Sequence, residues 1–390
     1  MPVITTTDAL ARACERLRGE PFLCLDTEFI RETTYWPRLC LVQLAGPDGA
    51  AVAVDPMAAD VDLAPLLDLL NDRRVLKVVH AARQDLEMFY HLSRRVPGPL
   101  FDTQVAAMVC GFGEAVAYDR LVRKLAGATI DKSSRFTDWA RRPLSERQIA
   151  YALADVEHLP TIYRKLDRRL RETGRTAWVT EEIKVLSDPA IYALEPRDAW
   201  RRIKTRSANP RLLAVLREVA AEREAYAQKH DVPRQRVLRD EALVEIAAHE
   251  TASREALLAI RGMSKGLAQG PLGEALIKAV ARGLAVPEAA SPSIERPAPA
   301  PRGVGPLVEL MKVLLKMRCE ENDVAVKLVA STADLERIAA DDAADVPALK
   351  GWRRALFGDD ALALKRGELA LTSEGGRIAL VELEAAQDPR

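Results

Sequence analysis

The spacing of apolar residues changes near residue 180 of this 390-residue chain. Before that point, short apolar runs of strand length alternate with longer stretches in which apolar residues recur at helical spacing. From about residue 210 onward the helical spacing continues almost without strand-like runs. We expect strands at 22–26, 39–44, 51–55 and 75–79 and helices at 63–70, 85–92, 103–110 and 145–170. This order predicts a mixed sheet covered by helices, followed by a helical region.

The helical region contains an internal repeat. The matching residues of its two copies all lie 92 positions apart. They are Asp231, Val232, Val237, Leu243, Ile246, Ala247 and Ala248 in the first copy, and Asp323, Val324, Val329, Leu335, Ile338, Ala339 and Ala340 in the second. Residues 286–306, between the copies, are rich in proline and alanine, which is typical of an extended, semi-rigid linker. The repeat predicts two copies of one small helical domain.

Composition narrows the class of protein. Lys and Arg number 57, as do Asp and Glu, so the chain is not a polycation that coats nucleic acid. The five cysteines include no CxxC pair, which argues against a zinc site and for reduced thiols. The first twenty residues lack the apolar core of a signal peptide, and no apolar run approaches the roughly 18 residues of a membrane span. We therefore expect a soluble, cytoplasmic protein without a membrane partner.

The stretch FLCLDTEF at 22–29 places two carboxylates at the end of an apolar run. Because side chains alternate between the faces of a strand, Asp26 and Glu28 point one way and Thr27 the other. Two acids on one face repel each other unless a cation or a shared proton lies between them. The pair suits a divalent metal ion, but an isolated pair is also typical of a solvated strand end. A third acid, Asp85, opens a later helix, where acids are also common helix-dipole partners.

A further helix carries a tyrosine and an acid on one face. Ser145 and Gln148 form a capping-box pattern that starts this helix. Tyr151 and Asp155 lie four positions apart, so their side chains are one turn apart on the same face. A tyrosine hydroxyl next to a metal-binding carboxylate can hold a water molecule for attack. Pro160 removes a backbone donor and is expected to kink or end the helix.

Four segments carry a resemblance to a known family. They are DTEF at 26–29, VVHAARQDLEMF at 78–89, FDTQVAAM at 101–108 and DKSSRFTDWARRPLSERQIAYALADV at 131–156. Together they resemble the exonuclease motifs and intervening segments of ribonuclease D, in the DEDD superfamily of 3′→5′ exonucleases. The repeated helical unit resembles the HRDC domain, of which that family carries one or two copies.

The resemblance implies a fold and a domain order. The fold is an α/β ribonuclease-H-like exonuclease domain, with a mixed sheet flanked by helices, followed by two all-α HRDC-like domains. The implied parts are the exonuclease domain at 1–180, a helical connector at 181–209, the first HRDC-like domain at 210–288, the Pro/Ala-rich linker at 289–303 and the second HRDC-like domain at 304–390.

The resemblance also implies a catalytic site. Asp26, Glu28, Asp85 and Asp155 match the family's metal-binding carboxylates, and Tyr151 matches the tyrosine of the DEDDy branch. In that scheme two divalent metal ions, Mg²⁺ or Mn²⁺, lie roughly 4 Å apart at the 3′-terminal phosphodiester. Asp26 bridges the ions, while Glu28 and Asp155 complete the site that activates the water. Asp85 acts on the second ion, and Tyr151 orients the nucleophile.

Two histidines offer alternative ligands. His80 and Asp85 are spaced as in the final motif of the DEDDh branch, but His80 follows a strand and comes too early in the chain, so we interpret it as structural. His158 follows Asp155 by three positions. A lone helical histidine is more often a satisfied surface or core group than a ligand.

Cationic and aromatic residues cluster before the final motif. Cations over phosphates and aromatic rings stacked on splayed bases bind single-stranded ends. The residues assigned to substrate binding are Thr27, Phe29, Lys132, Arg135, Trp139 and Arg141. The alternative is a solvated, charged loop that Trp139 anchors in the core.

Three functions remain open at the level of sequence. The first is a metal-dependent 3′→5′ exoribonuclease that releases 5′-mononucleotides from RNA with a free 3′ end, for which the resemblance suggests precursor tRNA. The second is a single-stranded DNA exonuclease with the same site. The third is a non-catalytic RNA-binding scaffold. A monomer is expected, because two linked helical units could clamp a substrate within one chain.

Overall fold

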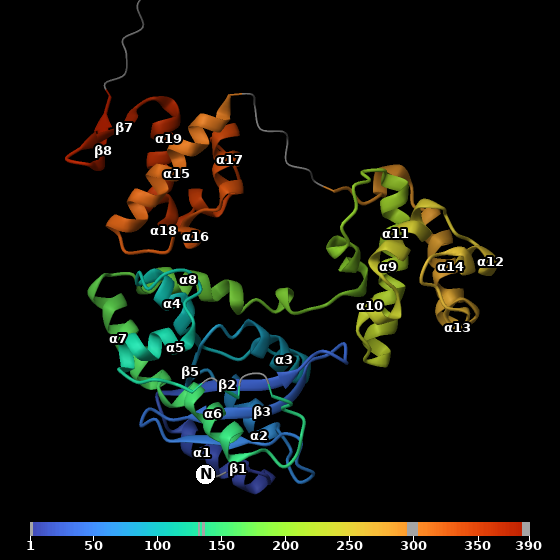
Figure 1. The fold of residues 1–390 in the computed structure, drawn as a ribbon, viewed down its shortest axis with the longest axis horizontal. Coiled ribbons are helices and arrows are strands. Elements are labelled where there is room, and N and C mark those ends of the chain that lie inside the picture. Colours follow the sequence, from blue (N-terminus) through green and yellow to red (C-terminus); the bar gives the residue numbers. More distant parts are fainter. Residues whose placement is uncertain (1–2, 132, 135–136, 295–302, 384–390) are drawn as a thin grey trace, which may run out of the picture.

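A computed structural model describes residues 3–131, 133–134, 137–294 and 303–383. Figure 1 shows an α/β part at the N-terminal end, coloured blue to green, and two helical units, coloured yellow and orange to red. Buried apolar side chains form separate clusters in the three parts. In the part of the chain that is described, no helix is both long and apolar enough to cross a membrane.

The α/β part contains a mixed sheet, as the sequence pattern predicts. Its strand order is β1-β4-β3-β2-β5-β6. The strands are β1 (Val3–Ile4), β2 (Phe22–Ile30), β3 (Arg38–Ala45), β4 (Ala51–Val54), β5 (Leu76–Val79) and β6 (Leu100–Asp102). β2 pairs antiparallel with β3 and parallel with β5, so it lies inside the sheet. The expected strand 22–26 is too short, because β2 continues through its two acids.

Helices cover this sheet. They are α1 (Thr7–Arg18), α2 (Ala64–Asn71), α3 (Arg83–Ser93), α4 (Thr103–Val109), α5 (Tyr118–Leu121), the π-helix η1 (Val122–Ala126), α6 (Glu146–Glu157), α7 (Leu159–Glu172) and α8 (Thr176–Leu186). α6 packs on β2, β3 and β4. The expected helix 145–170 is two helices, with Pro160 in the first turn of α7. The helix is therefore interrupted next to Pro160, as predicted.

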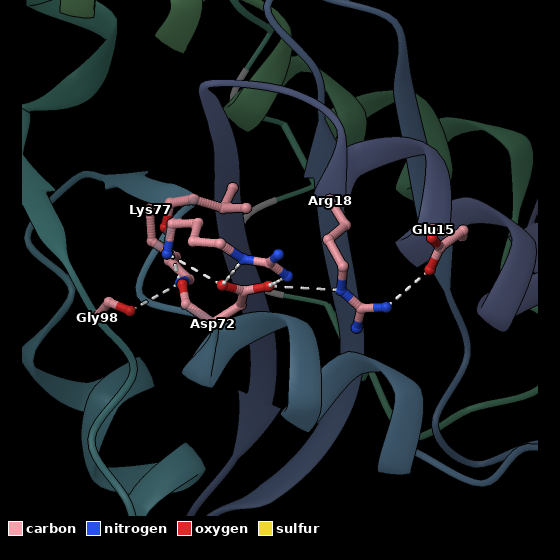
Figure 2. Close-up of polar contacts among 7 residues, drawn as sticks. Glu15, Arg18, Asp72, Lys77 and Gly98 are labelled. Carbon is pink, nitrogen blue, oxygen red and sulfur yellow. Dashed lines mark hydrogen bonds and ion pairs between the residues drawn. The ribbon is translucent and has the colours of Figure 1, made fainter.

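A buried lysine fixes the turn that leads into β5. Lys77 is fully buried, and its Nζ donates hydrogen bonds to the carbonyl oxygens of Asp72 (2.5 Å), Val75 (2.8 Å) and Gly98 (2.8 Å). Figure 2 shows these bonds beside the ion pair of Asp72 with Arg18, whose Nε lies 3.6 Å from Asp72 Oδ2. Burial lowers the pKa of Lys77 to about 8. The ammonium group thus satisfies three carbonyl groups around this turn.

A connector leads to the first helical unit. The connector contains the 3-10 helices η2 (Pro189–Ile191) and η3 (Pro196–Arg202). The unit contains α9 (Pro210–His230), α10 (Arg234–Val237), α11 (Asp240–Ala248), α12 (Arg254–Ala259), α13 (Lys265–Gln269), α14 (Pro271–Leu284) and the 3-10 helix η4 (Glu288–Ala290). Most of the linker expected at 289–303 lies outside the described residues.

The second helical unit repeats the start of the first. It contains α15 (Val304–Glu321), α16 (Val326–Val329), α17 (Thr332–Ala340), the 3-10 helix η5 (Pro347–Leu349), α18 (Gly351–Arg353), the π-helix η6 (Arg354–Gly358) and α19 (Asp359–Arg366). The bounds of α16 and α17 lie 92 positions after those of α10 and α11. The repeat in the sequence therefore corresponds to a repeat in secondary structure.

The second unit is not all-α, so that expectation was wrong in one respect. β7 (Leu369–Glu374) and β8 (Arg377–Glu382) form an antiparallel hairpin after α19. Gly375 and Gly376 form the turn with φ of 57° and 76°, which glycine adopts without steric cost. Leu369 is buried at the base of the hairpin. A Gly-Gly pair between two runs with apolar residues was the sequence signal for this hairpin.

Both helical units contact the α/β part. In the first unit, Glu224 accepts a hydrogen bond from the Tyr35 hydroxyl (2.5 Å), which belongs to the loop between β2 and β3. In the second unit, Trp352 stacks on Trp178 of α8 with ring centroids 4.3 Å apart. Figure 1 shows the second unit lying beside α4 and α8.

Candidate active site

The central strand β2 presents the first two acids. Its apolar start is buried, while Asp26 and Glu28 are half-buried. Asp26 lies opposite Gln43 of β3, and the pairing register of β2 with β3 shifts between Glu28 and Phe29. The extra residue of this irregularity is Cys40 on β3, because Glu28 pairs with Leu41 and Phe29 pairs with Leu39.

Asp85 comes from the neighbouring strand–helix unit. It lies in the first turn of α3 and is 8% exposed. The Thr27 hydroxyl, on the opposite face of β2 from Asp26, donates a hydrogen bond to the Asp85 carboxylate. Thr27 is itself buried. Its side chain therefore binds the carboxylate of a candidate catalytic residue, and its assignment to substrate binding stays a prediction.

α6 carries the third contribution. The Ser145 hydroxyl accepts from Gln148 N (3.2 Å), and Gln148 Oε1 accepts from Ser145 N (3.0 Å), which confirms the expected capping box. Tyr151 and Asp155 follow on this helix and, with Asp26, line one cavity of about 310 Å³. The helix thus brings its tyrosine and acid to the strand that carries Asp26.

The electrostatics tie the four carboxyl groups together. Burial raises the pKa of Asp26 well above its usual range, and the negative charges of Asp85, Asp155 and Glu28 raise it further. Burial also raises the pKa of Asp85 to about 6, although the Thr27 hydrogen bond opposes this shift. Like charges held this close favour either a proton or a cation among them.

The donor set fits a hard divalent cation. Carboxylate oxygens are the ligands that Mg²⁺ and Mn²⁺ prefer. The amide of Gln43, across from Asp26, is buried and without a hydrogen-bond partner among the described residues. Within those residues, however, no three His, Cys, Asp or Glu side chains are already arranged to enclose an ion.

Several residues that line the cavity were not predicted from the sequence, among them Tyr118 and Gln104. Tyr118 lines the cavity and donates a hydrogen bond from its hydroxyl to Ala154 O (3.2 Å). Burial raises its pKa, and so do the charges of Asp155 and Asp26. Gln104 also lines the cavity. Gln104 lies in the quoted segment FDTQVAAM, which was the available signal, whereas nothing in the sequence distinguished Tyr118.

The two histidines lie in different surroundings. His80 lines the cavity, and its Nδ1 is 3.0 Å from Thr103 Oγ1. Burial lowers the pKa of His80. His158 lies at the junction of α6 and α7 and is half-buried.

The expected substrate residues fare differently. Trp139 is only 3% exposed and packs with Cys40, Leu41, Ala53, Ala152 and Leu153. Its indole anchors the loop, so base stacking by Trp139 was the wrong expectation. Phe29 is half-buried and Arg141 is exposed. Lys132 and Arg135 lie outside the described residues.

Comparisons with known proteins place the chain. Residues 1–171 match the 3′-5′ exonuclease family and residues 212–280 match the HRDC domain. Ribonuclease D of Gluconacetobacter diazotrophicus is 54% identical over 96% of this chain and 95% of the relative. The chain belongs to the ribonuclease D family. Ribonuclease D of Nitrobacter hamburgensis is 52% identical over 98% of this chain and 100% of the relative.

A solved structure agrees with this ribonuclease D membership. The crystal structure of Escherichia coli RNase D, described as an exoribonuclease involved in structured RNA processing, matches with a TM-score of 0.78 and 31% identity. The match covers 94% of this chain and 98% of that chain. The chain is therefore a hydrolase, a 3′→5′ exoribonuclease. The non-catalytic scaffold is excluded.

Proposed function

We propose that this ribonuclease D-family enzyme hydrolyses RNA from its 3′ end by two-metal-ion catalysis and releases 5′-mononucleotides. The observation that carries the proposal is that the charges of Asp85, Asp155 and Glu28 act on the half-buried carboxyl group of Asp26, which lines one cavity with Asp155 and Tyr151. A carboxyl group whose negative charge is disfavoured by burial and by three neighbouring acids is a costly arrangement unless a cation compensates it.

The four carboxylates would hold the ions, Mg²⁺ or Mn²⁺. When bound, two such ions polarise the phosphate, lower the pKa of a water molecule and stabilise both oxygens of an in-line displacement. The charges of the other three acids all raise the pKa of Asp26, which suits a ligand shared by both ions. The Thr27 hydroxyl orients the Asp85 carboxylate.

Tyr151 positions the attacking water in this proposal. It lies one turn before Asp155 on α6 and lines the same cavity as Asp26. A phenolic hydroxyl both donates and accepts hydrogen bonds, so it can hold a water without forming a covalent intermediate. The expected rate loss in Tyr151→Phe is about 10²- to 10⁴-fold, the range for one positioned catalytic group.

The natural substrate and setting are part of the proposal. We infer precursor tRNA with a free 3′ end as a substrate, from the family resemblance and from the structured-RNA role of the Escherichia coli relative. Arg141, exposed on the loop before α6, and half-buried Phe29 are the described candidates for RNA contacts. The enzyme is proposed to act as a cytoplasmic monomer, with residues 304–390 as a second HRDC-like domain.

One assay tests the chemistry. Matched 5′-labelled RNA and DNA oligomers, with a 3′-hydroxyl or a 3′-phosphate, are incubated with Mn²⁺ or with EDTA. A ladder shortened one nucleotide at a time on RNA, absent in EDTA, supports the proposal. Equal digestion of DNA would favour the single-stranded DNA exonuclease instead. Digestion that persists in EDTA would contradict the metal mechanism.

A further inference from the structure

Asp102 joins the starts of two helices. It is 2% exposed and ends β6, directly before α4. Its Oδ1 accepts hydrogen bonds from Gln104 N (2.8 Å) and Val105 N (3.4 Å), which caps α4. The same carboxylate accepts from Ala81 N (3.0 Å, to Oδ1) and Ala82 N (3.1 Å, to Oδ2), in the turn before α3. Its two oxygens therefore serve backbone groups of both segments.

The turn before α3 depends on such support. Ala81 has φ of 57°, in the left-handed region that residues other than glycine rarely adopt. Ala82, at the N-cap of α3, has no side-chain oxygen with which to cap that helix. A strained backbone persists only where the surrounding structure fixes it. Asp102 supplies that constraint, because it binds both N–H groups of the turn.

Thr103 binds the two residues that precede this turn, Val79 and His80. Thr103 Oγ1 donates a hydrogen bond to Val79 O (2.8 Å). His80 Nδ1 lies 3.0 Å from Thr103 Oγ1. Since a hydroxyl has one hydrogen and Val79 O accepts it, Thr103 accepts the second bond from His80 Nδ1–H. Every residue from 79 to 82 is thus bound to Asp102 or Thr103.

Asp85 takes its place from this turn. It is the third residue of α3, directly after the turn, and its carboxylate already accepts the Thr27 hydrogen bond. A small shift in the turn would move Asp85 away from Thr27 and from Asp26. We propose that Asp102 is a positioning residue for the exoribonuclease reaction, which fixes the turn before α3 and thereby holds Asp85 at the proposed metal site. The inference rests on the proposed function.

Asp102→Asn separates the two tasks of this carboxylate. The amide oxygen of Asn can still cap α4, but its NH₂ group cannot accept the N–H of Ala82. We expect Mn²⁺ affinity, measured without RNA by electron paramagnetic resonance of the free ion, to fall about 10- to 100-fold. We expect kcat to fall by a similar factor while the KM for RNA is unchanged.

Thr6→Ala is the matched control. Thr6 caps α1 through a hydrogen bond from Ala9 N (3.4 Å), so its loss removes a helix cap away from the site. This variant should lower the melting temperature without changing Mn²⁺ affinity. A general loss of stability would therefore not imitate the effect expected for Asp102→Asn.

The outcomes are distinct. Wild-type Mn²⁺ affinity and kcat in a folded Asp102→Asn variant would overturn the inference. Absence of Mn²⁺ binding in the wild-type protein would overturn the proposed function and the inference with it. If Asp102→Asn loses its helical circular dichroism, Thr103→Val tests the same turn. Thr103→Val should weaken Mn²⁺ binding, whereas Thr103→Ser, which keeps the hydroxyl, should bind Mn²⁺ as the wild type does. Unchanged Mn²⁺ affinity in Thr103→Val would overturn the inference.

Discussion

Asp231 and Asp323 occupy equivalent positions in the two helical units, and each binds the exonuclease domain. They lie 92 positions apart, after the long first helix of each unit, with φ of 50° and 49°. Asp231 Oδ1 accepts hydrogen bonds from Tyr35 N (3.0 Å) and Trp36 N (2.9 Å). Asp323 Oδ2 instead pairs with Arg169 (3.1 Å). The same turn of each unit therefore docks on a different part of one domain.

This relationship predicts how the first unit is held. Asp231→Ala removes the acceptor of two backbone N–H groups in the loop after β2, and bonds to a charged group contribute about 1.5–3 kcal/mol each. The amides of Tyr35 and Trp36 should then exchange with deuterium faster, as measured by hydrogen exchange. Asp323→Ala is the control, because it leaves this loop intact. Unchanged exchange in Asp231→Ala would contradict the docking.

The raised pKa of Asp85, about 6, predicts a pH dependence. In the metal-free protein the folded state binds this proton more tightly than the unfolded state, whose pKa is about 4. Proton binding by Asp85 therefore stabilises the folded state below about pH 4, and this contribution to the free energy of unfolding is lost as pH rises through 6. Since Mn²⁺ needs the ionised carboxylate, the rise in melting temperature on adding Mn²⁺ should be large at pH 8 and small at pH 5. An equal rise at both pH values would count against a metal site at Asp85.

The buried Lys77 predicts that stability rises with pH in the alkaline range, opposite to the effect of Asp85. Its pKa is about 8 when folded and about 10.4 when unfolded, so the cost of burying the charge declines as pH rises between these values. Lys77→Met leaves three carbonyl groups without their donor and should destabilise the protein by about 1–3 kcal/mol or more at pH 7. The gap in melting temperature between wild type and variant should widen from pH 7 to pH 9.5. A gap that narrows would contradict the buried ammonium.

The buried Trp139 and the exposed Arg141 separate stability from RNA binding. Trp139→Ala opens a cavity in the cluster beneath α6 and should cost about 3–5 kcal/mol of stability. Its KM for RNA, measured well below the melting temperature, should stay near the wild-type value. Arg141→Ala should raise the KM and leave the melting temperature unchanged. The reverse pattern would restore Trp139 as a base-stacking residue.

Local patterns predicted the parts of the site that depend on local spacing. The Ser145–Gln148 capping box and the four-residue spacing of Tyr151 and Asp155 are properties of one helix, so the sequence was sufficient. The register of the helical repeat was likewise predictable, because the spacing of 92 places α16 and α17 where α10 and α11 predict them.

Tertiary contacts explain what the sequence did not reveal. Alternation along β2 correctly predicted that Thr27 and Asp26 lie on opposite faces of the strand. That Thr27 binds Asp85 depends on the position of α3 in the fold. Trp139 is interleaved with cations in the sequence, and its burial follows from the packing of α6 on β3 and β4. Asp102 is an ordinary helix cap by local pattern, and its bonds to Ala81 and Ala82 are visible only in the fold.

We propose that the carboxylates around Asp26 catalyse metal-dependent cleavage at RNA 3′ ends. The most direct measurement compares wild type, Asp155→Asn and Asp167→Asn on 5′-labelled RNA with Mn²⁺, with RNA binding measured in parallel. Asp167 is the control, because its carboxylate pairs with Arg171 on α7 (3.0 Å) rather than with the site. We predict that Asp155→Asn binds RNA but cleaves it at least about 10³-fold more slowly, while Asp167→Asn cleaves normally. Cleavage by Asp155→Asn at the wild-type rate would contradict the account.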